Sequence, residues 1–260
     1  MNNKCKTIRQ NILRISHESG HGHIPTCFSI IEILYGVYSH MKHEPQNPKM
    51  SDRDLFILSK GHASLAQYCV LAEFGYFSIK EVFDFGAYKT KFGCHADRLK
   101  IPGIEASTGS LGHGIGLAVG MALGIQLKNA SRNVYTIIGD GESNEGTIWE
   151  ALMVADNLNL NNLTIIYDNN NSHARGLQIT NPTEKLKAFG CEVYEVDGHD
   201  ENAIVNILQK PQKKLKAIVA NTIKGYGCET LSCNHYEWHR KSPNNEQLTN
   251  LMEELNASSI

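Results

Sequence analysis

The chain has 260 residues, of which 41% are hydrophobic, and its formal net charge is −2. This length and composition suit a folded globular protein and exclude a disordered tail. The near-neutral charge gives no electrostatic reason to expect nucleic acid or anionic lipid as a partner. No apolar run approaches the roughly twenty residues that a membrane span needs, so we expect no membrane insertion.

The seven cysteines are scattered along the chain, odd in number and never spaced as CxxC. This distribution fits reduced thiols better than a disulfide framework. The N-terminus leads directly into an amphipathic pattern without the apolar core of a signal peptide. We therefore expect a cytoplasmic protein.

Short apolar runs alternate with helical patterns along the chain. The predicted strands are residues 55–59, 134–138, 163–167, 192–196 and 217–222, and the predicted helices are residues 29–38, 112–128, 147–158 and 200–208. Several runs are nearly continuous β-branched or aromatic residues, which is typical of strands buried on both faces of a parallel sheet. The alternation predicts an α/β fold, a three-layer α/β/α domain with a mostly parallel sheet. We predict a single domain over residues 1–260, with residues 240–260 as a C-terminal extension.

A glycine-rich turn with an acidic residue follows the second predicted strand, as Gly139-Asp140-Gly141-Glu142. Ligands of open α/β sheets bind at the carboxyl ends of strands, close to helix N-termini. Glycines there let backbone amides approach a phosphate, and the helix dipole favours its charge. The aspartate is a hard oxygen ligand of the kind that Mg²⁺ or Ca²⁺ prefers. An ordinary glycine turn explains this short motif equally well when it is considered alone.

A second polar motif, Asp168-Asn169-Asn170, follows the next predicted strand. One helix and one strand separate it from Asp140, so the chain returns to the same edge of the sheet. A carboxylate oxygen of Asp140 and the amide oxygen of Asn170 can then share a cation that also holds a diphosphate. Mg²⁺ usually takes few protein ligands beside phosphate oxygens and water. This combination predicts a thiamine diphosphate site.

Further motifs extend the pattern over the chain. They are Ser19-Gly20-His21, Leu58-Ser59-Lys60-Gly61-His62-Ala63, Pro102–Gly114 (PGIEASTGSLGHG), Gly139–Gly146 (GDGESNEG), Val196–Asp200 (VDGHD), Lys224–Gly227 (KGYG) and Trp238-His239. In this order and spacing, the chain resembles the N-terminal, thiamine-diphosphate-binding domain of the transketolase family over nearly its whole length. The resemblance implies the thiamine-diphosphate-binding fold and its diphosphate-binding domain.

The resemblance also implies roles for individual residues. Asp140 and Asn170 are expected to bind Mg²⁺ (or Ca²⁺ or Mn²⁺) through side-chain oxygens, and Ser172 through its backbone carbonyl. The implied cofactor-binding residues are His62, Gly109, Ser110, Leu111, Gly139, Asp140, Gly141, Glu142, Asn170 and His239. The implied catalytic residues are His21, His62, His95, Glu145 and His239. Neutral imidazoles suit such sites because they donate or accept protons near neutral pH, and Glu145 matches a glutamate that bonds across the subunit boundary to the carboxylate that activates the cofactor.

The family's chains continue into a pyrimidine-binding domain and a further C-terminal domain, which have no counterpart here. The glutamate that activates the cofactor lies in the pyrimidine-binding domain. The resemblance therefore implies the N-terminal subunit of a split, two-component transketolase, active only with a C-terminal partner subunit in an α2β2 assembly. The implied reaction transfers a two-carbon ketol unit from a ketose (phosphate) to an aldose (phosphate). The alternative is a specialised thiamine-diphosphate enzyme that acts on a nucleotide- or branched-sugar precursor or on a 2-oxoacid.

Two segments depart from the family pattern. His23 replaces a small residue after Ser19-Gly20-His21, and Asn171–Gly176 (NSHARG) lengthens the loop after Asn170, which puts Ser172 as a metal ligand in question. We hypothesise that His23, His173 and Arg175 adapt the site to an unusual donor or acceptor. A solvated loop is an equally good interpretation of His173 and Arg175.

Two other classes of protein compete with the enzyme interpretation. A zinc site could use Cys228, Cys233, His235 and His239, whose residue types zinc favours although their spacing is looser than in common zinc modules. His17, His21 and His23 could likewise suggest a metal. An inactive regulatory or scaffold subunit is the other class, and the intact set of Asp140, Asn170, His62 and Glu145 argues against it.

Overall fold

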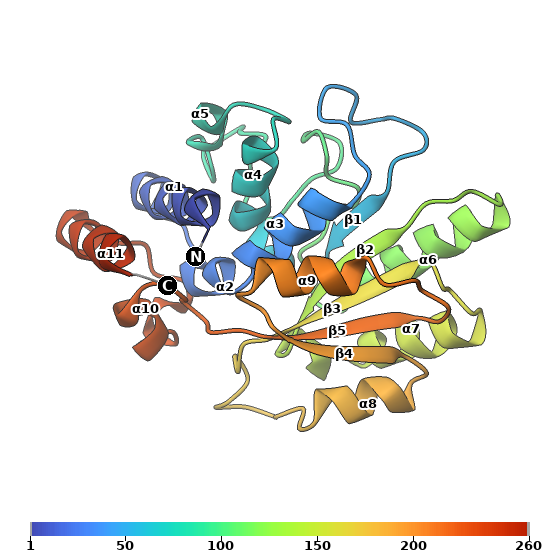
Figure 1. Ribbon diagram of the computed structural model, residues 1–260. Helices are drawn as coiled ribbons and strands as arrows, with labels where there is room; N and C mark the ends of the chain where they lie inside the picture. The colour runs from blue at the N-terminus through green and yellow to red at the C-terminus, as the bar shows by residue number, and fades with distance from the viewer. Residues whose placement is uncertain (1, 259–260) are drawn as a thin grey trace.

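A five-stranded parallel sheet forms the middle layer of the structure, a computed structural model that describes residues 2–258 (Figure 1). Its strands are β1 (Leu55–Leu58), β2 (Val134–Gly139), β3 (Leu163–Asn169), β4 (Glu192–Asp197) and β5 (Lys216–Asn221). Their order is β1-β2-β3-β5-β4, and all four pairings are parallel. The predicted α/β/α class is confirmed, and each predicted strand agrees with the structure to within two residues at either end.

The register of the sheet brings the two polar motifs together. β2 and β3 are neighbours, and Gly139 pairs with Asp168. The backbone N–H of Asp140 donates to the carbonyl of Asp168 at 3.2 Å, just where β2 ends. Asp140 and Asn170 therefore leave adjacent strands at the same edge of the sheet, as the sequence predicted.

Side chains of successive strand residues point to opposite faces of the sheet and enter two separate cores. On β1, Phe56 and Leu58 belong to one core, and Leu55 and Ile57 to the other. The first core packs against α1 (Asn3–Ser19), α2 (Ile24–Ser29), α3 (Ile31–His40), α4 (Ser64–Glu73) and α9 (Glu201–Leu208). The second packs against α6 (His113–Leu127), α7 (Gly146–Asn157) and α8 (Pro182–Ala188). Figure 1 shows the two helical layers on either side of the sheet.

The helix predicted over residues 29–38 is wrong at its start. The chain forms two helices there, and Ile30, between α2 and α3, leaves helical geometry with φ −111° and ψ 9°. Pro25 lies in the first turn of α2, where a proline is well tolerated. The additional short α2 carries the residues from His23 onward into the neighbourhood of the strand ends.

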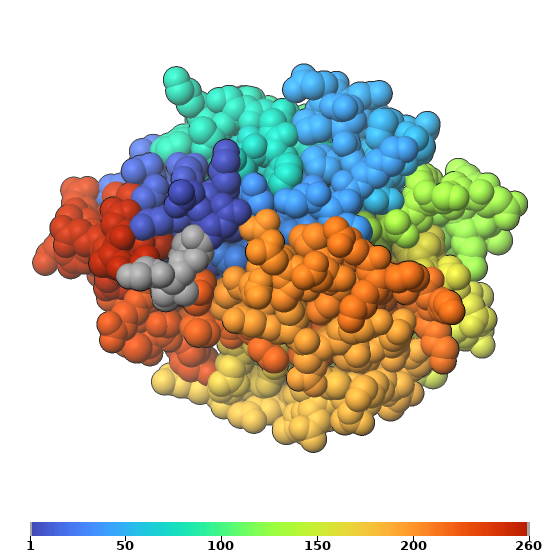
Figure 2. Space-filling view, viewed as in Figure 1, coloured from blue at the N-terminus to red at the C-terminus, as the bar shows by residue number. Residues whose placement is uncertain are grey.

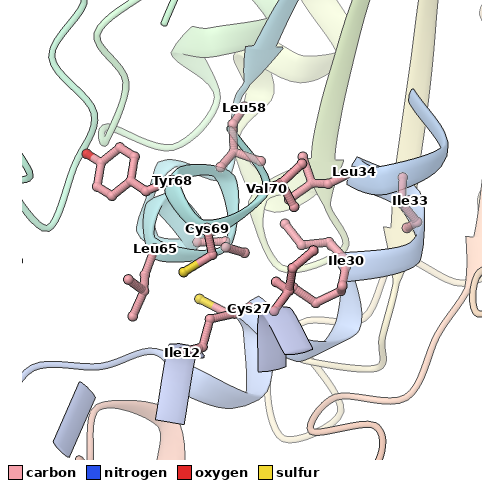
Figure 3. Packing of buried hydrophobic residues seen from close by; sticks show 14 of the residues in the cluster. Ile12, Cys27, Ile30, Ile33, Leu34, Leu58, Leu65, Tyr68, Cys69 and Val70 are labelled. Carbon is pink, nitrogen blue, oxygen red and sulfur yellow. The ribbon is translucent and has the colours of Figure 1, made fainter. Parts of the chain in front are cut away.

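Buried packing holds α2 in this position. Figure 3 shows Cys27 of α2 facing Cys69 of α4, with Ile12 of α1 and Leu65 beside them. These four side chains are at most 2% exposed. Burying an aliphatic side chain fully contributes about 1.5–3 kcal/mol, so this contact stabilises the position of α2 relative to α4.

The end of the described chain is helical. α11 (Asn245–Ala257) begins with a capping box at Asn244 and buries Leu251 and Leu255. It packs on α1, and Figure 2 shows the C-terminal residues (red) next to the N-terminal helix (blue). The remaining elements are η1 (Gly61–Ala63), α5 (Ile79–Val82), η2 (Glu142–Asn144), α10 (Glu229–Cys233) and η3 (Glu237–His239). The single-domain organisation stays a prediction.

Candidate functional site

A cavity of about 590 Å³ opens at the carboxyl ends of β1, β2 and β3. The predicted site residues that line it are His62, His95, Gly109, Leu111, Gly139, Asp140, Gly141, Glu142, Asn170, Ser172 and His239. His23, Thr26, Lys60 and Arg240 complete the lining. Residues that are far apart in the sequence thus form one concave site where open α/β sheets bind their ligands.

The oxygens of Asp140 and Asn170 converge at the floor of this cavity. Asp140 Oδ2 and Asn170 Oδ1 both accept from the backbone N–H of Ser172, at 2.7 and 3.0 Å. The other oxygen of Asp140 accepts from the N–H of Gly141 at 2.6 Å. Two hard oxygens from neighbouring strand ends therefore lie close enough to share one cation.

Asp168 fixes the orientation of the Asn170 amide. Its carboxylate is fully buried and accepts from Lys60 Nζ at 2.5 Å and from Asn170 Nδ2 at 2.8 Å. Ser29 and Thr222 donate to the same carboxylate at 2.9 and 2.5 Å. Because its nitrogen is engaged by Asp168, the amide of Asn170 presents its oxygen to the cavity.

The charge balance at the floor favours a divalent cation. Burial, reinforced by the nearby Asp168 carboxylate, raises the pKa of Asp140. The positive charge of Lys60 is compensated by Asp168, with which it forms a buried ion pair at 2.5 Å. His173 and Lys60 only partly offset the charge of an ionised Asp140, and a metal ion beside it would favour the charged form. The residues present fit a metal-bound diphosphate.

Three imidazoles form one wall of the cavity. The ring of His23 lies 5.4 Å from that of His62 and 5.3 Å from that of His239, centroid to centroid. Burial, and then the charge of Lys60, lower the pKa of His62 to about 2. Burial and His239 lower the pKa of His23 to about 4, and burial with Lys224 also lowers the pKa of His239. All three are therefore neutral at pH 7, and each neutral ring has one nitrogen that donates and one that accepts a hydrogen bond.

A cationic group, Lys224, lies beside the cavity residues Ser172 and His239. Lys224 Nζ donates to Ser172 Oγ at 2.7 Å and lies 3.5 Å from His239 Nδ1. Burial and the nearby Lys60 lower its pKa to about 8, so it stays mostly protonated at neutral pH. Together with Arg240 in the cavity wall, it provides the positive surroundings that a diphosphate requires.

Glycines let two loops touch at the cavity through their backbones. A Cβ on Gly61 would lie 2.7 Å from the nitrogen of Gly109, closer than side chains tolerate. Gly109 itself has φ +154°, and its Cβ would lie 2.9 Å from the ring of His95. Any larger residue at these positions would push the loop of residues 107–112 away from η1.

Glu142 lines the cavity, but protein donors occupy its carboxylate. One oxygen accepts from Ser59 Oγ at 2.6 Å and from the N–H of Gly112 at 2.9 Å. The other accepts from the N–H of Gly139 at 3.0 Å. Burial raises the pKa of this carboxyl group. Glu142 thereby joins the ends of β1 and β2 to the loop before α6.

Three predicted residues lie outside the cavity wall. His21 is exposed, and its ring packs against Gly86. Ser110 is exposed between two residues of the wall, and the exposed Glu145 precedes α7. Sequence motifs give the neighbourhood of such residues but not the direction of their side chains.

Sequence reasoning assigned no role to Thr26, Lys60 or Arg240, which the structure places in the wall. Lys60 follows β1 and could have been found by the same argument about strand ends that found Asp140. Arg240 directly follows the predicted His239. No sequence signal indicates Thr26, whose hydroxyl lies 3.4 Å from His62 Nε2.

The zinc interpretation is wrong for the part of the chain that the structure describes. Within residues 2–258, no three or more His, Cys, Asp or Glu side chains are grouped so as to hold a metal. Cys228 is buried with its Sγ directed at the carbonyl of Leu251, whereas Cys233 is exposed. His17 Nδ1 is engaged with the carbonyl of Pro243 at 2.8 Å. In the same range, no helix has the length and apolar character required to cross a membrane.

Taken together, these features define an α/β protein with a candidate diphosphate site at the carboxyl edge of its sheet. Residues 2–256 match the family described as "Transketolase, thiamine diphosphate binding domain". The chain therefore belongs to the transketolase family, and its assignment as a transferase of this type is confirmed.

Relatives of nearly the same length as this chain are named as transketolase subunits. One from Actinobacillus succinogenes, named for apulose 4-phosphate, is 36% identical over 97% of this chain and 94% of the relative. The 6-deoxy-6-sulfo-D-fructose transketolase subunit SqwG of a Clostridium species is 40% identical over 87% of this chain and 86% of the relative.

Solved transketolases share the fold. The transketolase of Campylobacter jejuni superposes with a TM-score of 0.91 at 27% identity, covering 98% of this chain. This chain corresponds to 43% of the length of that enzyme.

Proposed function

We propose that this chain is the thiamine-diphosphate-binding subunit of a two-component transketolase. The observation that carries the proposal is the convergence of Asp140 Oδ2 and Asn170 Oδ1 on one point of the cavity floor. These oxygens would hold Mg²⁺, or Ca²⁺ or Mn²⁺ in its place, and the backbone carbonyl of Ser172 would be a third ligand.

The remaining walls suit the rest of the cofactor. His62, His239 and the backbone of Gly139 and Gly141 would contact the diphosphate, whose charge Lys224 and Arg240 would offset. Residues 109–111 would lie beside the rings. When bound, thiamine diphosphate supplies the electron sink for cleavage of a ketose C–C bond. The imidazoles of His62, His95 and His21 would bind sugar hydroxyls and move protons.

An exposed apolar surface supports a partner subunit. Leu117 and Leu127 on α6 are 45% and 74% exposed, and Met153 and Val154 on α7 are 61% and 47% exposed. α6 and α7 pack side by side, as Figure 1 shows. Exposed apolar side chains gathered on neighbouring helices are common at interfaces. We propose that these helices contact subunits of an α2β2 assembly, that the partner provides the activating glutamate, and that Glu145 bonds to it.

The substrates we propose are a ketose donor and an aldose acceptor, phosphorylated or otherwise anionic. The names of the subunit relatives, with apulose 4-phosphate and a sulfofructose, support such sugars. A specialised sugar precursor or a 2-oxoacid is the alternative, since the same residues would bind the cofactor.

All seven cysteines are free thiols, which supports a cytoplasmic location.

Calorimetric titration tests the cofactor site. Thiamine diphosphate with Mg²⁺ is titrated into the chain alone and into its complex with the partner, sought in the neighbouring reading frame. We expect binding that tightens with the partner and that Asp140→Ala weakens at least about tenfold. The matched control is Asp52→Ala, which removes an exposed carboxylate bonded only to Lys42 among the described ion pairs. Absence of binding by the folded complex would refute the proposal and favour the inactive scaffold.

A further inference from the structure

The side chain of His173 lies next to Asp140, which lines the cavity, and its Nδ1 has no hydrogen-bond partner. It is 9% exposed, and its Nδ1 lies 3.0 Å from Asp140 Oδ2. The two atoms are within ion-pair distance, but no hydrogen bond joins them, and the buried Nδ1 has no hydrogen-bond partner. An imidazole nitrogen left unpaired in this way next to a buried carboxylate points to a ligand that is shared by both groups.

The separation of these two atoms is the one that a shared metal requires. Ligand oxygens and nitrogens lie about 2.0–2.2 Å from a small divalent cation, so adjacent ligands at right angles are about 3.0 Å apart. A direct hydrogen bond between Nδ1 and Oδ2 could also have this length, but the imidazole ring is not oriented to make one.

The loop that carries His173 is fixed by the surrounding structure. The guanidinium of Arg175 stacks on the ring of Tyr236, 4.1 Å from its centroid. The N–H of Gly176 donates to the carbonyl of His173 at 2.8 Å and closes a turn. His173 and Arg175, both in the segment that lengthens the loop after Asn170, thus have connected positions: Arg175 anchors the loop, and the loop holds His173 beside Asp140.

We propose that His173 is an additional protein ligand of the divalent metal, through Nδ1, beside Asp140 and Asn170. The inference rests on the proposed function of the same site. An imidazole ligand favours divalent transition metals, Mn²⁺ least among them, over Mg²⁺ and Ca²⁺, which prefer oxygen ligands. The lengthened loop therefore shifts the metal preference of this chain away from Mg²⁺ and Ca²⁺ and towards transition metals.

Electron spin-echo spectroscopy of bound Mn²⁺ tests the ligand directly. The full chain, with its partner subunit, is loaded with Mn²⁺ and thiamine diphosphate and is compared with protein that contains ¹⁵N-labelled histidine. We expect a ¹⁴N modulation that changes to that of ¹⁵N on labelling and that His173→Asn abolishes. His17→Ala, whose imidazole lies outside the cavity, is the matched control and should retain the modulation.

Metal titrations provide the second measurement. We expect His173→Asn to lower the affinity for Mn²⁺ about tenfold or more and to change that for Mg²⁺ less. Bound Mn²⁺ without histidine modulation would overturn the role of His173 and leave the proposed function intact. An equal loss of affinity for Mn²⁺ and Mg²⁺ would also overturn it, because a nitrogen ligand should distinguish the two metals whereas a contact to the diphosphate would not. Failure of the wild-type complex to bind any metal would overturn both proposals.

Discussion

Replacing Arg9 with methionine would leave the carboxylate of Glu32 buried without its guanidinium partner. Arg9 is fully buried on α1 and donates to both oxygens of Glu32 on α3, at 2.5 and 2.7 Å. It also donates to the carbonyls of Phe28 at 2.8 Å and Tyr226 at 3.1 Å. The guanidinium thus connects three helices with the loop that follows the site residue Lys224.

Removal of one member of a buried ion pair costs about 3–5 kcal/mol, because the remaining charge stays buried and unpaired. We expect Arg9→Met to lower the free energy of unfolding by this amount. The double substitution Arg9→Met with Glu32→Leu removes both charges and should be more stable than Arg9→Met alone. His199, whose Nδ1 lies 3.1 Å from Glu32, then loses its partner, so recovery should be incomplete.

Urea unfolding at several pH values gives the free energies and an independent check. Burial alone would raise the pKa of Glu32, but Arg9 and His199 outweigh burial and lower it from 4.5 to about 2. The contribution of Glu32 is therefore fully present above pH 4.5 and is lost as the pH falls towards 2. Arg9→Met should flatten this loss. An unfolding free energy within about 1 kcal/mol of wild type at pH 7 would refute the reasoning.

Three further predictions concern the site, acid sensitivity and the thiols. Gly61→Ala should destabilise the chain by about 1–3 kcal/mol and weaken thiamine diphosphate binding in calorimetry, whereas Gly120→Ala, in open space, should do neither. Because the folded-state pKa of His23 is about 4 against 6.5 ordinarily, stability should fall as the pH drops from 6.5 towards 4. Urea midpoints of His23→Gln should show a smaller fall, and an equal fall would contradict the assignment. In a thiol-reagent assay, the exposed Cys233 should react first and the five buried cysteines only on unfolding; rapid reaction of all seven would exclude this core.

The amino-acid sequence by itself determined the layered fold and the floor of the site. Strand runs such as residues 163–167 are nearly continuous apolar or β-branched residues, which is typical of parallel strands buried on both faces. Parallel strands bring their carboxyl ends to one edge, so the positions of Asp140 and Asn170 followed from the order of elements. Such inferences need only local periodicity and the geometry of a sheet.

Only the tertiary structure decided which side chains enter the cavity and what they contact. The pairing of Lys60 with Asp168 joins residues 108 positions apart, and no local pattern encodes such a contact. His21 and Glu145 lie in family motifs but point outside the wall, because packing of the surrounding loops sets their direction. The sequence placed His173 only in a loop without an assigned role. The structure shows it beside Asp140, because the stacking of Arg175 on Tyr236 fixes that loop in space.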